Sequence, residues 1–168
     1  MSLFHLVLIL VACARVLELI YSQRNTRRLL EEGAVEAGRG HYPLIVALHV
    51  VWFLAMLATI PRDAPPNWPW LALFLALQLG RIWVLGSLGR FWTTRVVTLP
   101  GAGLVRRGPY RFIRHPNYVI VELEFVSLPL AFGAPLLALI FGLANAAMLW
   151  WRIRVENCAL AARRPADQ

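Results

Sequence analysis

The sequence predicts an all-α fold: a polytopic membrane protein with five transmembrane helices, the last two forming a tight helical hairpin. Hydrophobic residues make up 59% of the 168-residue chain and charged residues only 15%, and the mean hydropathy is +0.59. Apolar blocks of roughly membrane-spanning length recur along the chain, separated by polar connections. The length fits a single domain.

The first apolar block, residues 3–21, contains two charged residues, Arg15 and Glu18. Three residues apart on a helix, they share a face and can pair, which lowers the cost of holding charge in lipid. Two interpretations are open: an ion pair that only stabilises the bundle, or side chains that line a cavity.

A polar connection, residues 22–42, follows the first block. Ser22 or Asn25 is expected to cap a short interfacial helix that Gly33 ends. The second apolar block, residues 43–60, begins after this connection.

The third apolar block, residues 70–88, carries Arg81 near its centre. An arginine facing lipid there would be costly, so we expect its side chain to point into the bundle. In the following connection, the run 96–99 favours an extended chain but is too short for a sheet of its own.

The fourth block, residues 118–132, and the fifth, which ends at Trp150 and Trp151, are the shortest. A helix over residues 118–132 reaches about 22 Å at 1.5 Å per residue, below a hydrocarbon core of roughly 30 Å. We expect the pair to form a hairpin, because only a short turn containing Gly133 and Pro135 separates them.

The arginines predict the orientation in the membrane. All 17 basic residues are arginine. Most lie in the first and third connections and the tail: Arg24, Arg27, Arg28, Arg39, Arg90, Arg95, Arg106, Arg107, Arg111, Arg114, Arg152, Arg154, Arg163 and Arg164. The second connection contains only Arg62. This asymmetry predicts an amino terminus outside and a carboxyl terminus in the cytoplasm.

Other partners are not indicated by the composition. The net charge is +8, but the arginines that produce it gather in alternate connections, as orientation in a membrane requires. Nucleic-acid binding is therefore not expected. Cys13 and Cys158 have no spacing typical of zinc ligands or of a disulfide framework, so no metal is expected.

Two polar clusters, residues 106–118 and 152–157, flank the predicted hairpin and should return to the same membrane edge. Pro116 favours a helix start, whose exposed amides attract a carboxylate, and Arg114 reinforces this attraction. Glu156 supplies the opposite charge. The clusters therefore fit either a site for a zwitterionic cofactor or a collar of basic residues with one acidic partner.

The motifs Gly108-Pro-Tyr-Arg-Phe-Ile-Arg-His-Pro-Asn-Tyr118 and Arg152-Ile-Arg-Val-Glu156, in this order around a hydrophobic hairpin, resemble the isoprenylcysteine carboxyl methyltransferase family. That family includes phospholipid methyltransferases and other small membrane enzymes that use S-adenosylmethionine. The resemblance covers residues 92–160. Earlier residues resemble a bacterial branch that methylates alkylpyrones and phenolic lipids: Glu18, Ser22, Arg24, Asn25, Gly33, Ala34, Glu36, His41 and Tyr42.

The resemblance implies a set of cofactor-binding residues: Tyr110, Arg114, His115, Pro116, Asn117, Tyr118, Arg152, Glu156 and Asn157. Two positions depart from the family pattern. Ile120 stands where glycine is common, and Asn157 stands where a second glutamate is usual. The longer carboxyl-terminal segment of the eukaryotic enzymes is also missing, which argues against a prenylated protein as substrate.

The expected function is methyl transfer from S-adenosylmethionine to an oxygen of a lipophilic acceptor in the bacterial inner membrane. Residues 1–168 would form one integral-membrane methyltransferase domain with a cofactor-binding half over about 89–160. The acceptor would be an alkylpyrone, a phenolic lipid or an isoprenyl-type carboxylate. Glu124 or His115 would act as base, Arg152 or Arg81 would stabilise the acceptor anion, and Glu124 and Arg152 are the catalytic candidates. The acceptor would contact a further set of residues: Arg15, Glu18, Arg81 and Trp92.

Three alternatives remain open. The acceptor could be the amine of a phospholipid, or the chain could be an NADPH-dependent membrane reductase, although it lacks a G-x-G-x-x-G element. A non-catalytic membrane scaffold would explain the hydrophobicity but not the paired motifs. Membrane lipids and a lipophilic small molecule are the expected partners.

Overall fold

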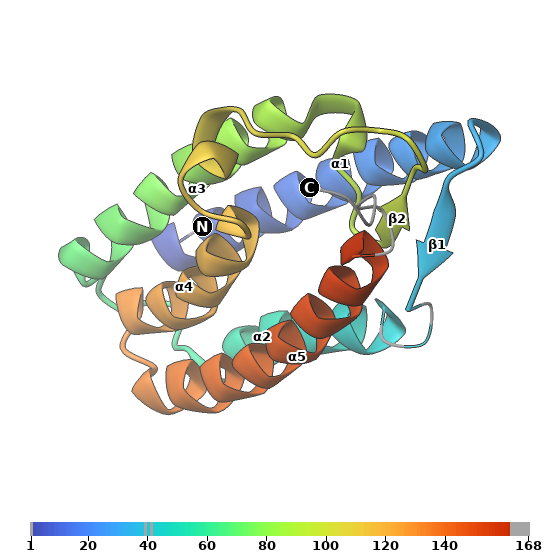
Figure 1. The fold of residues 1–168 in the computed structure, drawn as a ribbon. Helices are drawn as coiled ribbons and strands as arrows, with labels where there is room; N and C mark the ends of the chain where they lie inside the picture. The colour runs from blue at the N-terminus through green and yellow to red at the C-terminus, as the bar shows by residue number, and fades with distance from the viewer. Residues whose placement is uncertain (1, 39, 41, 162–168) are drawn as a thin grey trace.

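The computed structural model describes residues 2–38, 40 and 42–161. Arg39, His41, Arg163 and Arg164, which entered the predictions above, lie outside these residues. Five α-helices dominate the described chain (Figure 1): α1 (Leu3–Glu31), α2 (Tyr42–Thr59), α3 (Trp68–Leu88), α4 (Pro116–Ala131) and α5 (Pro135–Ala161). The predicted all-α class is confirmed.

Four of the five helices are long and apolar enough to cross a membrane: α1, α2, α3 and α5. The fourth, α4, has 16 residues and reaches about 24 Å at 1.5 Å per residue. Five spanning helices were predicted, and the structure supports four of them by length and composition. Large apolar side chains cover the outside of the bundle, as a lipid-facing surface requires: Leu10, Leu17, Leu79, Ile82, Leu139 and Leu143.

Helix α4, the shortest of the five, is enclosed by protein. It packs between α3 and α5 (Figure 1), and nine of its residues are buried. Phe125 and Leu128 join the main apolar core with Trp52 of α2 and Phe74 of α3. Ile120, which replaces the glycine of the family pattern, packs against Gly80 of α3, where a Cβ atom would lie 3.4 Å from its Cδ1 atom. The isoleucine is therefore accommodated in direct contact with the α3 backbone.

The hairpin of α4 and α5 is present, but α5 is longer than predicted. It has 27 residues and continues beyond Trp151 to Ala161. The predicted end rested on the loss of hydrophobicity, whereas the segment after Trp151 contains arginine, glutamate, alanine and leucine, which are good helix formers. The polar residues after Trp151 end the apolar block, but they do not end the helix.

Helix α1 is also longer than predicted, and the expected interfacial helix after it does not exist. α1 runs unbroken for 29 residues, capped at its start by Ser2, until Gly33 turns the chain with φ +92°. Residues 22–31 contain no glycine or proline, so nothing interrupts the helix. Ser22 and Asn25 are therefore not caps but buried side chains of a helix interior.

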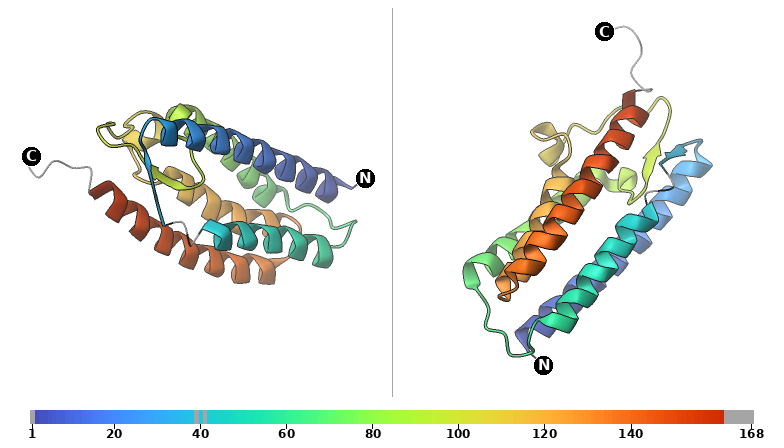
Figure 2. Two further views of the ribbon diagram at one scale, coloured as in Figure 1. Left: turned by 90° about the vertical axis from the view of Figure 1, so that its right-hand side faces the viewer. Right: turned by 90° about the horizontal axis from the view of Figure 1, so that it is seen from below.

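A two-stranded antiparallel sheet was not expected. Strand β1 (Val35–Ala37) pairs with β2 (Val96–Thr98), with Val35 opposite Thr98. The extended run predicted over residues 96–99 is present, but it finds a partner strand in the first polar connection, so its shortness does not prevent a sheet. Figure 2 shows both strands at the same end of the bundle as the carboxyl end of α5. Two short 3-10 helices, η2 (Gly89–Phe91) and η3 (Gly108–Arg111), lie in the connection from α3 to α4.

Candidate active site

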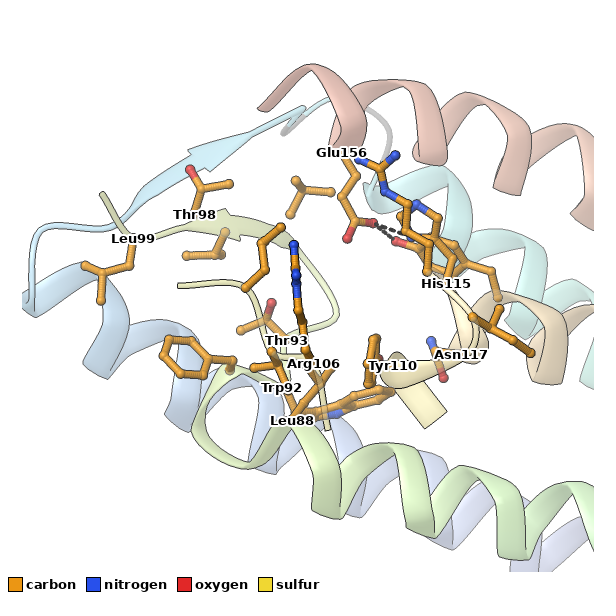
Figure 3. Close-up of a pocket in the computed structure, with 18 of the residues that line it drawn as sticks. Leu88, Trp92, Thr93, Thr98, Leu99, Arg106, Tyr110, His115, Asn117 and Glu156 are labelled. Atoms are coloured by element: carbon orange, nitrogen blue, oxygen red, sulfur yellow. Dashed lines mark hydrogen bonds and ion pairs between the residues drawn. The ribbon is translucent and has the colours of Figure 1, made fainter. Parts of the chain in front are cut away.

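A cavity of about 430 Å³ opens at the end of the bundle that carries the sheet. It lies between β2, η3, the start of α4 and the last turns of α5 (Figure 3). Its volume is within the range of pockets that bind small molecules. Glu156, His115 and Asn117 lie toward one end of the cavity, and Thr98 and Leu99 lie toward the other (Figure 3).

Three side chains from two helices form the polar centre of this cavity. The Tyr118 hydroxyl of α4 donates a hydrogen bond to the Glu156 carboxylate of α5. Arg152, one turn before Glu156, donates through Nε to the same hydroxyl at 2.8 Å, and its guanidinium carbon lies 5.5 Å from the centre of the Tyr118 ring. Arg152 and Glu156 share a face of α5 because helical positions four apart are neighbours. The start of α4 and the end of α5 thus meet at one point.

His115 extends this centre along the cavity wall. Its ring stacks on Tyr118 with 5.2 Å between centroids, and Nδ1 lies 3.9 Å from Oε2 of Glu156. The other ring nitrogen, Nε2, lies 3.4 Å from the Asn157 amide oxygen. Asn157, which replaces the family's usual second glutamate, is therefore a neutral partner of His115.

Thr94 also belongs to the site, although the sequence analysis missed it. Its carbonyl oxygen accepts a hydrogen bond from Nη2 of Arg152 at 2.6 Å. Since the contribution is a backbone atom, no side-chain pattern could have indicated it. Arg152 is thereby held between the connection after α3 and the first turn of α4.

Two residues of the cavity wall each contain a buried polar atom that has no hydrogen-bond partner within the described part of the chain. These atoms are the indole Nε1 of Trp92 and the amide Oδ1 of Asn117. Buried polar groups are rarely left unpaired in proteins. These residues offer one donor and one acceptor, and the same wall contains the Glu156 carboxylate and the Arg114 guanidinium. This set fits a polar cofactor that carries a positive and a negative charge, such as S-adenosylmethionine.

Tyr110 adds a neutral donor to the wall. Burial raises the pKa of its phenol above the ordinary value, and the charge of Glu156 raises that pKa further. The phenol therefore keeps its proton at neutral pH and can donate a hydrogen bond.

The structure gathers most of the residues predicted to bind the cofactor. Those that line the cavity are Tyr110, Arg114, His115, Asn117, Tyr118, Arg152 and Glu156. Pro116 is buried at the first turn of α4 and fixes where that helix begins. Asn157 lies behind His115 rather than in the wall.

Three of the four residues predicted to contact the acceptor form a second, separate cluster with the catalytic candidate Glu124, whereas the fourth, Trp92, lines the cavity. Arg15 and Glu18 of α1, Arg81 of α3 and Glu124 of α4 meet inside the bundle. Arg81 bonds Glu18 at 2.7 Å and Glu124 at 3.2 Å, and Arg15 bonds Glu18 at 3.1 Å and Glu124 at 3.4 Å. The Arg15–Glu18 pair is thus part of a charge-balanced network, and none of these four residues lines the cavity.

Gln78 completes this network and was missed by the sequence analysis. Its amide donates to Glu124 at 2.8 Å and accepts from Arg15 at 2.8 Å. Gln78 lies three positions before Arg81 on the same helix face, and that spacing was the available signal. Trp92 connects the network with the cavity: it lines the cavity, and the Arg81 guanidinium carbon lies 5.9 Å from the centre of its ring.

Comparisons with known proteins place the chain in a family. The uncharacterized protein YpbQ of Bacillus subtilis is 36% identical over 163 residues, which cover 94% of this chain and 96% of YpbQ. An uncharacterized protein of Haemophilus influenzae is 24% identical over 156 residues, covering 90% of this chain and 91% of that protein. No solved structure matches the chain significantly. A family model matches residues 70–162, more than half of the chain and both polar clusters of the cavity: the chain belongs to the isoprenylcysteine carboxyl methyltransferase (ICMT) family.

Proposed function

We propose that this protein is an S-adenosylmethionine-dependent methyltransferase of the membrane that methylates an oxygen atom of a lipophilic acceptor. Family membership implies a membrane methyltransferase that uses this cofactor. The observation that supports the proposal in this chain is the cavity centre of Tyr118, Arg152 and Glu156, with the unpaired atoms of Trp92 and Asn117 beside it.

The cofactor's two charges have partners in the cavity wall. Glu156 offers a carboxylate to an ammonium group, and Tyr118 and Arg152 fix the position of that carboxylate. Arg114 and the amides at the start of α4 offer positive charge to a carboxylate. Apolar side chains of the wall, which include Leu88 and Leu99, are suited to contact the apolar groups of such a cofactor.

S-adenosylmethionine supplies an electrophilic methyl group on a sulfonium. The protein's contribution is then mainly alignment of the acceptor oxygen with that group. His115 is the base we assign to the cavity, since its ring lies in the wall, whereas Glu124 is held by Arg81, Arg15 and Gln78. An acidic acceptor hydroxyl needs only a weak base such as imidazole.

The acceptor we propose is a long-chain alkylpyrone or phenolic lipid. The residues from Glu18 to Tyr42 resemble the bacterial branch that methylates such lipids. The hydroxyl groups of these lipids are acidic enough for His115 to deprotonate. An isoprenyl-type carboxylate would also present an oxygen. The competing acceptor is the amine of phosphatidylethanolamine.

Two experiments test the assignment. Calorimetric titration of the purified protein with S-adenosylmethionine and with NADPH decides the class, and we expect saturable binding of the former alone. NADPH binding without S-adenosylmethionine binding would favour a reductase, and binding of neither would favour a scaffold.

The second experiment identifies the acceptor. Membranes containing the protein, radiolabelled cofactor and either a long-chain alkylpyrone or phosphatidylethanolamine are extracted and the lipids counted. We expect label on the pyrone. Label on the amine lipid alone would overturn the choice of acceptor while leaving the methyltransferase assignment standing.

A further inference from the structure

Two buried polar residues of α1 lie against the segment that forms one wall of the cavity. Ser22 and Asn25 are 1% and 2% exposed. They belong to a helix that lies wholly outside the region matched by the family model, residues 70–162. Polar side chains this deeply buried need partners, and theirs are in residues 89–94.

Asn25 holds the two ends of the tight turn after α3. Its Nδ2 atom donates to the Gly89 carbonyl at 3.2 Å and to the Trp92 carbonyl at 2.9 Å. The second bond fixes the backbone of the residue whose indole lines the cavity. A carboxamide can satisfy two carbonyls in this way because its nitrogen has two N–H groups.

Ser22 holds the next part of the same segment. Its Oγ accepts the Thr94 N–H at 2.7 Å and lies 2.9 Å from the Thr94 hydroxyl. Tyr42 of α2 also bonds that hydroxyl, at 3.2 Å. The backbone N–H of Thr94 is therefore held by α1, and its side chain by both α1 and α2.

The Thr94 carbonyl is in turn the acceptor that holds Arg152. A continuous series of hydrogen bonds runs from Ser22 through Thr94, Arg152 and Tyr118 to Glu156. Without the Ser22 hydroxyl, the Thr94 N–H loses its acceptor. The carbonyl group of Thr94 is then no longer held in position by α1. Arg152 would then lose a fixed partner, although nothing in α4 or α5 has changed.

We propose that Ser22 and Asn25 are positioning residues of the cofactor cavity, acting through Thr94 and Trp92 rather than by touching the cofactor. The inference rests on the proposed function for what the cavity binds. It implies that α1 completes a binding site whose other walls lie within the family region.

The test compares Ser22→Ala with Ser127→Ala. Ser127 is a matched control, because it is fully buried in α4 and its hydroxyl has no partner among the described residues. We expect Ser22→Ala to raise the dissociation constant for S-adenosylmethionine roughly three- to tenfold, the effect of about one hydrogen bond, and Ser127→Ala to leave it unchanged. Equal affinity of the two variants would overturn the proposal.

A double-mutant cycle shows whether the effect passes through Arg152. Lysine at this position cannot donate to Tyr118 and Thr94 together as the guanidinium does. We therefore expect Ser22→Ala to have little further effect in an Arg152→Lys background. Fully additive losses of affinity would mean that Ser22 does not act through Arg152, and would overturn the proposal.

Hydrogen exchange of the cofactor-free protein gives a readout that does not depend on the proposed function. Ser22→Ala should accelerate exchange of the Thr94 amide, and Asn25→Asp, which keeps the shape but removes both donors, should loosen residues 89–92. If the wild-type protein binds no S-adenosylmethionine, the proposed function fails, and unchanged exchange in both variants would separately refute the positioning role.

Discussion

Arg81 places its guanidinium carbon 5.9 Å from the centre of the Trp92 ring, and this contact joins the charged network inside the bundle to the wall of the cavity. Trp92 is 3% exposed, so the contact is desolvated on the side that faces the network. Cation–π contacts strengthen when water is excluded. The indole ring is therefore held by the network through Arg81, and the same residue lines the cavity.

Trp92→Phe should weaken cofactor binding without unfolding the protein. Phenylalanine keeps a ring for Arg81 but has no N–H for a bound molecule. We expect a loss of about 0.5–1.5 kcal/mol in calorimetric titration. Trp52→Phe is the control, since the Trp52 indole nitrogen is also buried and unpartnered but lies in the apolar core. Equal losses in both variants would contradict a cavity role for the Trp92 N–H.

Glu156→Gln should reduce the affinity for S-adenosylmethionine by roughly 1.5–3 kcal/mol, because a charged hydrogen bond is replaced by a neutral one. Glutamine can still accept from Tyr118, so the fold should persist. Glu32→Gln, which affects an exposed pair with Arg90, is the control for charge alone. Unchanged affinity of folded Glu156→Gln would make Glu156 a structural partner of Arg152 only.

Glu18→Gln should destabilise the bundle by about 3–5 kcal/mol, since it leaves Arg81 and Arg15 without half of their compensating charge. Thermal unfolding in detergent, monitored by circular dichroism, measures this loss of stability. Glu31→Gln should have little effect, because the Arg27–Glu31 pair is mostly exposed. Similar transitions for both variants would show that the network contributes little to stability.

Gly108→Ala should disrupt η3 and with it the cavity. Gly108 has φ +58°, and an added Cβ atom would lie 2.0 Å from Oγ of Ser87. Backbone strain and overpacking each cost about 1–3 kcal/mol, so the variant should lose at least about 2 kcal/mol of stability. Gly103→Ala, with open space around the new methyl group, should be tolerated. A stable Gly108→Ala protein would refute this close contact.

The orientation predicted from the arginines can be tested by cysteine labelling. In a Cys13→Ala background, a cysteine at Asn67 should react with an impermeant reagent from outside. The exposed Cys158 should react only after permeabilisation. The reverse pattern would invert the protein and place the cavity on the outer face.

Features that depend on chain order and local pattern could be predicted from the sequence. The hairpin of α4 and α5 follows from two apolar blocks with a short turn, and it brings Tyr118 and Glu156 together as expected. Pro116 marks the start of α4 for a local steric reason.

Other features arise from contacts between distant segments and have no local signal. The pairing of β1 with β2 joins two connections, and the Thr94 carbonyl can be assigned only when Arg152 is seen beside it. Ser22 and Asn25 suggest helix caps by residue type, but their tertiary contacts override that preference. The residue types of Arg15, Glu18, Arg81 and Glu124 in apolar blocks already suggested that these four side chains meet inside the bundle, but which carboxylate each guanidinium binds could not be read from the sequence.

The Arg15–Glu18 contact also bears on how the chain enters the membrane during synthesis. Both residues belong to the first helix, and they pair with each other at 3.1 Å without needing any later segment. Arg81 and Glu124, which complete the network, are translated long afterwards. The apolar part of the nascent first helix, residues 3–21, can therefore insert with its two charges paired. These charges gain Arg81 and Glu124 as further partners when α3 and α4 arrive.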